Sequence, residues 1–107
     1  MHRVLGPGLL ESAYETCLAY ELTQRGLAVR RQAAQPIVYE ELTLEAGYGI
    51  DLLVNDAVIV EVKAIDTLLP VHQAQIMTYL RLSGCRLGFL INFNVKMSRN
   101  GVRRIVI

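Results

Sequence analysis

The chain has 107 residues, of which 52% are hydrophobic and 20% charged, and its formal net charge is +1. This length and composition describe one globular domain over residues 1–107 with a real hydrophobic core, and they leave no room for separate catalytic and regulatory domains. No apolar run approaches the roughly 20 residues of a membrane span and the N-terminus has no secretory pattern, so we expect a soluble, cytoplasmic protein.

The first predicted helix follows a turn at residues 5–8 and runs to about Arg25, with Gly26 as its stop signal. Apolar residues recur along it at spacings of three and four, which gives one buried stripe. Glu11 sits at the edge of that stripe and can face the core; alternatively, it is a first-turn acid that the helix dipole favours. Cys17 and Cys85 match no metal-ligand spacing and are expected to be reduced, buried thiols.

Apolar, β-branched segments separated by turn residues predict the strands. They cover residues 27–32, 37–39, 42–44, 49–54, 58–63, 87–93 and 102–107. The two three-residue segments form a short hairpin around Glu40 and Glu41, and Pro36 marks a strand start or an edge. A helix over 70–83, ended by Gly84, precedes the last two strands, which a turn at 96–101 joins. This order predicts an α/β or α+β fold with a mixed central sheet flanked by helices.

The second predicted helix carries a polar pair, Gln75 and Tyr79, one turn apart on the same face. Its inward-facing residues are expected to be Val71, Ala74, Met77 and Leu80. His72, near the helix start, is interpreted as a capping or surface residue and is not assigned to a site.

Charged residues interrupt two adjacent strands of the buried type at Asp51, Glu61 and Lys63. An isolated carboxylate in such a setting would lose several kcal/mol of solvation, so it should be neutralised, paired or bound to a cation. Residues alternate faces along a strand, and opposed residues share a face. A three-residue loop at 55–57, or a bulge, would place Asp51 opposite Glu61, whereas a two-residue turn would not. We predict the longer loop or a bulge.

Two carboxylates and a lysine on one face make a small oxygen-lined site that suits Mg²⁺ or Mn²⁺ rather than zinc. Lys63 could then orient or deprotonate a water molecule, or stabilise charge that develops on a phosphate. The alternative is a structural ion pair of Lys63 with Glu61 or Asp51 beside an ordinary core.

All ten acidic residues lie in residues 1–66 with five basic ones, whereas residues 67–107 hold six basic residues and no acidic one. The basic residues of the second part are Arg81, Arg86, Lys96, Arg99, Arg103 and Arg104. They could form a phosphate-facing surface beside the acidic pocket, or a solvated face that balances the other half.

Gly8, Glu11 and Tyr14 within LGPGLLESAYE form a G-x-x-E-x-x-Y motif. It is followed in order by DLLVNDAVIVEVKA, VHQAQIMTYLRLSG, LGFLINFNV and the final RRIVI. Together these segments, which cover nearly the whole chain, resemble the GxxExxY protein family, a compact branch of the PD-(D/E)XK nuclease superfamily. The resemblance implies a restriction-endonuclease-like core, with a metal site on adjacent strands of the mixed sheet.

By this resemblance, Asp51 and Glu61 are similar to the metal-binding carboxylates of the superfamily, with the Val62 carbonyl as a further ligand. Lys63 resembles the catalytic lysine. Glu11 resembles a helix glutamate that joins the metal site directly or through water. The implied cofactor is Mg²⁺ or Mn²⁺, and the implied activity is phosphodiester hydrolysis.

The resemblance also implies a nucleic-acid partner, with DNA expected more than RNA. Gln75 and Tyr79 form a Q-x-x-x-Y pair similar to one that lies near the active site and the nucleic acid in RecB-like exonucleases. Arg81, Arg103 and Arg104 are the basic residues expected to contact phosphates. Relatives usually have extra helix before the LGPG turn and often a basic residue before the strand aspartate, where this chain has Gly49 and Ile50.

The N-terminal helical segment of relatives is thus expected to be missing, which would leave apolar surface for a partner or a second copy. Two functions remain open at this point. One is a Mg²⁺-dependent nuclease, and the other is a catalytically inactive binding or regulatory module on the same fold. A homodimer is compatible with either.

Overall fold

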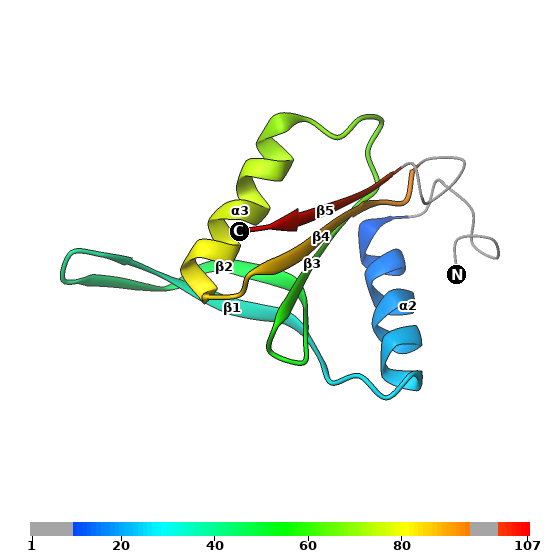
Figure 1. The fold of residues 1–107 in the computed structure, drawn as a ribbon, viewed down its shortest axis with the longest axis horizontal. Helices are drawn as coiled ribbons and strands as arrows, with labels where there is room; N and C mark the ends of the chain where they lie inside the picture. Colours follow the sequence, from blue (N-terminus) through cyan, green and yellow to red (C-terminus); the bar gives the residue numbers. More distant parts are fainter. Residues whose placement is uncertain (1–9, 95–100) are drawn as a thin grey trace.

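The computed structural model describes residues 10–94 and 101–107, which form a five-stranded sheet flanked by two helices (Figure 1). The strands lie in the order β1-β2-β3-β4-β5, with β3 and β4 parallel and the other neighbours antiparallel. The elements are α2 (Glu11–Gln24), β1 (Val29–Tyr39), β2 (Leu42–Val54), β3 (Val58–Lys63), α3 (Pro70–Ser83), β4 (Leu87–Asn92) and β5 (Val102–Val106). This mixed sheet with flanking helices confirms the predicted fold class.

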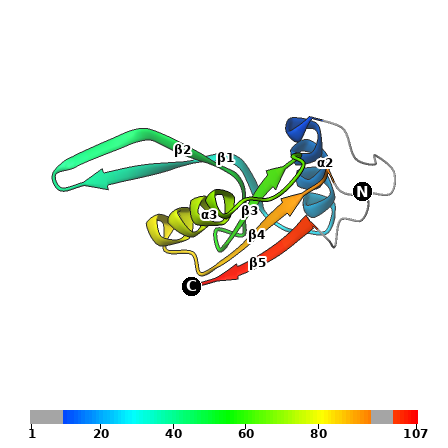
Figure 2. The same cartoon turned by 90° about the horizontal axis from the view of Figure 1, so that it is seen from above.

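The first two strands are longer than the sequence predicts, because segments predicted as separate strands join. Residues 37–39 belong to β1, and residues 42–44 and 49–54 both belong to β2. Figure 2 shows the outer part of this β1–β2 hairpin projecting beyond the other strands. The prediction of a separate short hairpin is therefore wrong, although its turn lies at residues 40–41 as predicted.

β1 contains two backbone irregularities near the boundary between its two predicted segments. Gln32 has a φ of 49°, and the β1–β2 register shifts between Gln35 and Ile37. Pro36 lies at that shift in β1, which is an edge strand, so its missing N–H leaves no gap inside the sheet. These residues bend the strand without ending it.

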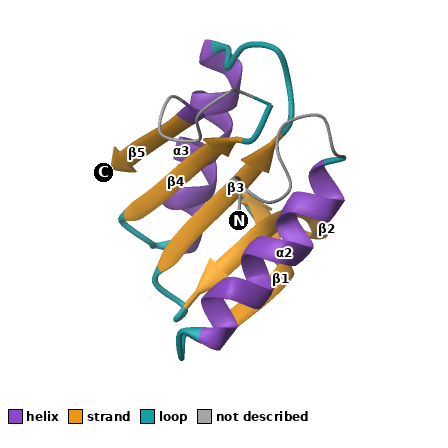
Figure 3. Cartoon of the chain, turned by 90° about the vertical axis from the view of Figure 1, so that its right-hand side faces the viewer, coloured by secondary structure: helices purple, strands orange, loops and turns teal. Residues whose placement is uncertain are grey.

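The helices cover opposite faces of the sheet, with α2 in front and α3 behind in Figure 3. The core under α2 includes Tyr14, Leu52, Val60, Val62 and Phe93. The rings of Tyr14 and Phe93 stack there, with their centroids 4.6 Å apart. The core under α3 includes Ile50, Ile59, Ile76, Leu80, Leu90 and Ile105. Each such buried aliphatic side chain contributes about 1.5–3 kcal/mol, which fixes both helices against the sheet.

The buried stripe of α3 differs from the predicted one. Val71 is 63% exposed and Ala74 is also exposed, whereas Ile76 and Tyr79 are buried. Only Leu80 of the predicted set is buried, with Met77 half-buried. The prediction for Val71 and Ala74 is wrong because the helix contacts the sheet through its 76, 79 and 80 positions, which turns the 71 and 74 positions aside.

Other local predictions can be compared with the described residues. The Nδ1 atom of His72 accepts a hydrogen bond from the Leu69 N–H at 2.9 Å, which confirms its capping role. Cys17 and Cys85 are free thiols, half-buried rather than buried. No helix in the described part of the chain has the length and apolar character to cross a membrane. The predicted turn at 5–8 and the basic residues Lys96 and Arg99 lie outside the described residues.

Candidate metal centre

The loop between β2 and β3 sets the register of the candidate site. Asn55 and Asp56 both have a φ of 53°, and the Ala57 N–H donates to the Val54 carbonyl at 3.0 Å. Asn and Asp tolerate this left-handed backbone better than most residues. Val54 then pairs with Val58, so three residues separate the paired positions. The predicted three-residue loop is confirmed.

The two strands separate just beyond Leu52 and Val60, the last paired residues of the ladder. At residues 51 and 61–62, hydrogen bonds between side chains and backbone N–H groups replace the backbone–backbone hydrogen bonds of the ladder. The Asp51 N–H donates to Glu61 Oε1 at 3.3 Å, and the Val62 N–H donates to Asp51 Oδ2 at 2.8 Å. The register thus brings the two carboxylates together where β2 and β3 diverge.

Glu61 is 4% exposed, which has a strong electrostatic effect. Burial removes water from the carboxylate, and the negative charge of Asp51 adds to the penalty. Together they raise the pKa of Glu61 to about 9, while the hydrogen bond from the Asp51 N–H and the positive charge of Lys63 act in the opposite direction. Near neutral pH the Glu61 carboxyl is therefore protonated. A cation bound at the same position would stabilise its ionised form instead.

Lys63 and Glu11 lie near the end of β3. By alternation along β3, Lys63 and Glu61 lie on the face of Ile59, which packs under α3. The exposed Glu11 side chain accepts a hydrogen bond at Oε2 from the Ala64 N–H at 3.3 Å, one residue beyond Lys63. In the described residues, no three His, Cys, Asp or Glu side chains form a group that could hold a metal. The structure thus joins Asp51 and Glu61, while the roles of Glu11 and of the Val62 carbonyl stay predictions.

Gln75 and Tyr79 meet as their spacing predicts. Gln75 Nε2 donates to the Tyr79 hydroxyl at 3.2 Å. Tyr79 is only 4% exposed and belongs to the core under α3, whereas Gln75 is half-buried. A contact of this pair with nucleic acid would therefore be made by Gln75, with Tyr79 holding its amide.

Among the basic residues that the structure describes, Arg81 and Arg104 do not lie together with Arg103. Arg103 pairs with Leu90, which pairs with Glu61, so Arg103 is level with Glu61 two strands away. It also lines an open groove of about 410 Å³ between α3 and β5. Arg104 alternates to the opposite face of β5, and Arg81 lies in the last turn of α3, at the end away from Lys63. Strand alternation and helix direction thus separate Arg81 and Arg104 from Arg103, and the contacts of all three with nucleic acid stay predictions.

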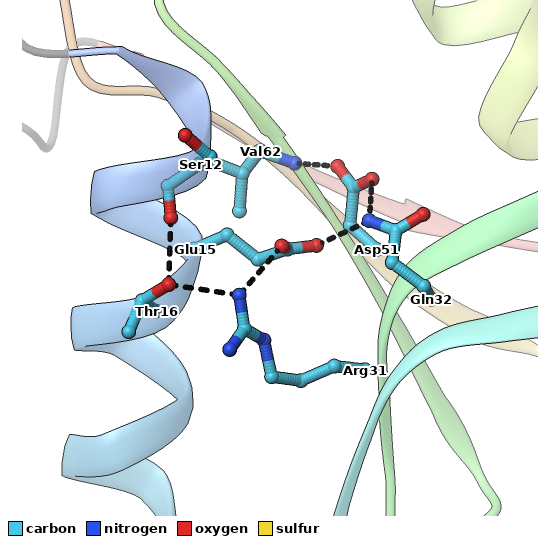
Figure 4. A network of polar contacts seen from close by, with 7 residues as sticks. All are labelled: Ser12, Glu15, Thr16, Arg31, Gln32, Asp51 and Val62. Carbon is cyan, nitrogen blue, oxygen red and sulfur yellow. Dashed lines mark hydrogen bonds and ion pairs between the residues drawn. The ribbon is translucent and has the colours of Figure 1, made fainter.

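Sequence reasoning missed a polar network that reaches the candidate site from α2 (Figure 4). Glu15 is 6% exposed, and its Oε2 atom lies 3.1 Å from Arg31 Nη2. Gln32 Nε2 lies 2.6 Å from Glu15 Oε1 and 3.3 Å from Asp51 Oδ1. Glu15 is four residues from Glu11 and so shares its helix face, which is the one signal that could have pointed to it.

A second missed residue, Asn92, fixes the loop that follows β3. It is 2% exposed, pairs with Lys63 across the parallel ladder, and bonds both backbone groups of Ile65. The Ile65 N–H donates to Asn92 Oδ1 at 3.1 Å, and Asn92 Nδ2 donates to the Ile65 carbonyl at 2.8 Å. This pair of bonds holds the chain just beyond Lys63.

The fold and the carboxylate pair define a nuclease-like protein: a mixed sheet between two helices, with Asp51 and Glu61 where two neighbouring strands diverge. The family model of the PD-(D/E)XK nuclease superfamily matches residues 1–105, so the chain belongs to that superfamily. No curated protein and no solved structure matches the chain. The narrower assignment to GxxExxY proteins stays a prediction.

Proposed function

We propose that this protein is a divalent-metal-dependent nuclease that hydrolyses phosphodiester bonds, with DNA as the first substrate to test. The observation that carries the proposal is the pairing of Asp51 with the buried Glu61, next to Lys63, at the divergence of β2 and β3. Membership of the superfamily supports the same reading. Mg²⁺ or Mn²⁺ is the proposed cofactor, and nucleic acid the proposed partner.

The residues at this point fit a hard divalent cation. All the proposed ligand atoms are oxygens, from Asp51, Glu61 and the Val62 carbonyl, with Glu11 close to the end of β3. The raised pKa of Glu61 reflects the cost of a negative charge in a buried position beside Asp51, a cost that a bound cation would lower. When bound, such a cation supplies water activation and charge neutralisation at a phosphate.

The chain's own residues would perform the remaining steps. Asp51 and Glu61 hold the site together through their bonds to each other's strand. Lys63 would place its ammonium group beside the scissile phosphate and stabilise the charge that develops there. Gln75 and Arg103 would position the flanking nucleotides, since Arg103 is level with Glu61 along the sheet.

The decisive experiment measures cleavage of single-stranded, duplex and branched DNA and RNA with Mg²⁺ or Mn²⁺. Wild type is compared with Lys63→Ala and with a matched control, Arg30→Ala. The control also removes one positive charge, from a surface ion pair of Arg30 with Asp56. Cleavage that needs metal, persists in Arg30→Ala and is lost in Lys63→Ala supports the proposal. Equal activity in all three proteins indicates a contaminant and contradicts it.

The second candidate is a binding or regulatory module without catalysis. It is favoured by the absence, in the described residues, of a third acidic side chain grouped with Asp51 and Glu61. Calorimetry with Mn²⁺ separates the two candidates, because the nuclease needs a site that Asp51→Ala and Glu61→Ala remove. Wild type that binds no Mn²⁺ would favour the module.

A further inference from the structure

Gln32 joins the helix α2 to the candidate metal centre through a single amide group. Its Nε2 atom carries two hydrogens, and one carboxylate lies near each side: Glu15 Oε1 at 2.6 Å and Asp51 Oδ1 at 3.3 Å (Figure 4). The other Asp51 oxygen accepts the Val62 N–H at 2.8 Å. Both oxygens of Asp51 are therefore held, each by a different strand.

The far side of this bridge is itself fixed. Glu15 Oε2 pairs with Arg31 Nη2 at 3.1 Å, and the same Arg31 nitrogen donates to Thr16 Oγ1 at 2.8 Å. The Thr16 hydroxyl in turn donates to the Ser12 carbonyl at 2.8 Å. Because Glu15 is 6% exposed and has both oxygens occupied, it is a rigid anchor for the Gln32 amide.

The backbone conformation of Gln32 and the glycine at position 49 both favour the observed position of the Gln32 side chain. Its φ of 49° lies in the left-handed region, which is unfavourable for a non-glycine residue and persists where the surroundings hold it. A Cβ atom on Gly49 would lie 2.9 Å from Gln32 Oε1, so only glycine at position 49 leaves room for the amide in this place. Two independent features therefore favour the observed position of the Gln32 side chain.

We propose that Gln32 is a positioning residue for Asp51, with Glu15 and Gly49 holding Gln32 in place. The proposal rests on the proposed function in taking Asp51 as a metal ligand. A carboxylate has about four lone-pair sites, so Asp51 can accept bonds from Gln32 and Val62 and still offer lone pairs to a cation. Gln32 thus orients the ligand without occupying its whole binding capacity.

The first test measures Mn²⁺ binding by calorimetry in wild type, Gln32→Asn and Gly49→Ala. Asparagine tolerates the left-handed backbone but is one methylene too short to bridge the carboxylates. Gly49→Ala leaves the candidate ligands intact and displaces only the flexible end of Gln32. We expect Gln32→Asn to bind Mn²⁺ about 10- to 100-fold more weakly, as is typical when a partner of a metal ligand is lost. Gly49→Ala should show a weakening in the same direction.

The matched control is Gln24→Asn, the same change at an exposed glutamine at the end of α2. Its Mn²⁺ affinity should equal that of wild type. Wild-type affinity in both Gln32→Asn and Gly49→Ala would overturn the proposal.

The second test needs no metal and separates this proposal from the proposed function. NMR hydrogen exchange of the Val62 amide, in EDTA, reports its bond to Asp51 Oδ2. Loss of orientation in Gln32→Asn should speed this exchange by about fivefold or more, the effect expected for one typical hydrogen bond. Amides of β4 should be unchanged, which excludes a global loss of stability.

Mn²⁺ binding and Val62 exchange test the two proposals separately. Wild type that binds no Mn²⁺ contradicts the proposed function, while faster Val62 exchange in Gln32→Asn still supports the positioning of Asp51. Unchanged Val62 exchange in both Gln32→Asn and Gly49→Ala overturns the positioning, whatever the protein does with metal.

Discussion

Glu61 couples the stability of the metal-free protein to pH. Its pKa in the folded state is about 9, against an ordinary value of 4.5, because it is buried beside Asp51. Between pH 4.5 and pH 9, Glu61 is therefore protonated in the folded protein and ionised in the unfolded chain. The stabilising contribution is fully present below pH 4.5 and is lost as the pH rises towards 9.

We expect the free energy of unfolding in EDTA to fall between pH 5 and pH 9, with a Glu61 contribution on the order of a few kcal/mol. Glu61→Gln keeps the size of the side chain and removes the titration, so its profile should be flatter. Urea unfolding at a series of pH values measures both. Identical slopes in the two proteins would show that Glu61 does not hold the proton.

At the residue scale, the sequence was sufficient for some contacts and not for others. Asp51 and Glu61 could be paired from strand parity alone, since only the loop length had to be decided. Glu15 and Gln32 could not be found this way, because their meeting depends on how α2 docks on the sheet. No periodicity within one element specifies a contact between a helix and a strand.

The loop at 55–57 is the element that determines the register of the candidate site. Asn55 contributes its left-handed backbone and also two bonds to Ala28: its N–H donates to the Ala28 carbonyl at 2.7 Å, and its Oδ1 accepts the Ala28 N–H at 2.9 Å. The loop is thereby tied to the chain segment that enters β1.

Asn55→Ala should lower the free energy of unfolding by about 1–3 kcal/mol, because it loses the side-chain bond and strains the backbone. Asn55→Gly loses only the bond and should cost less. Urea unfolding of both variants gives the comparison. Equal losses would show that the left-handed backbone carries no cost at this position.

At the element scale, both helices, the loop at 55–57 and the strands around it follow from local signals. The joining of the predicted strands in β1 and β2 did not follow from such signals. Pro36 resembles a strand end in the sequence, and the left-handed backbone at Gln32 leaves no sequence signal. The buried stripe of α3 was also misassigned, since Val71 and Ala74 are as apolar as the residues that pack. Only the docked orientation of the helix distinguishes them.

At the scale of the whole molecule, Arg103 and Arg104 lie on opposite faces of β5, and their contributions to DNA binding can be measured separately. A protein loses DNA affinity with added salt in proportion to the number of phosphates it contacts, with a slope of about 0.9 per contact. Arg103 is level with Glu61 and lines the groove beside α3, whereas Arg104 points to the other face of β5.

We therefore expect Arg103→Ala to weaken DNA binding and reduce the salt slope by about one unit. Arg104→Ala, its matched neighbour with the same change of charge, should have a smaller effect. Fluorescence anisotropy with labelled DNA over a range of salt concentrations measures both slopes. The reverse order would place the nucleic acid on the α2 face.

The position of β5 in the sheet has a consequence for how the protein behaves at high concentration. Among the described residues β5 pairs only with β4, so it is an edge strand of the sheet. Val102, Val106 and Ile107 are exposed there, and such an apolar edge promotes aggregation. Arg103 and Arg104 place two like charges in the middle of this edge. Like charges on an edge strand oppose edge-to-edge pairing, so Arg103, proposed to contact phosphates, would with Arg104 also protect the edge.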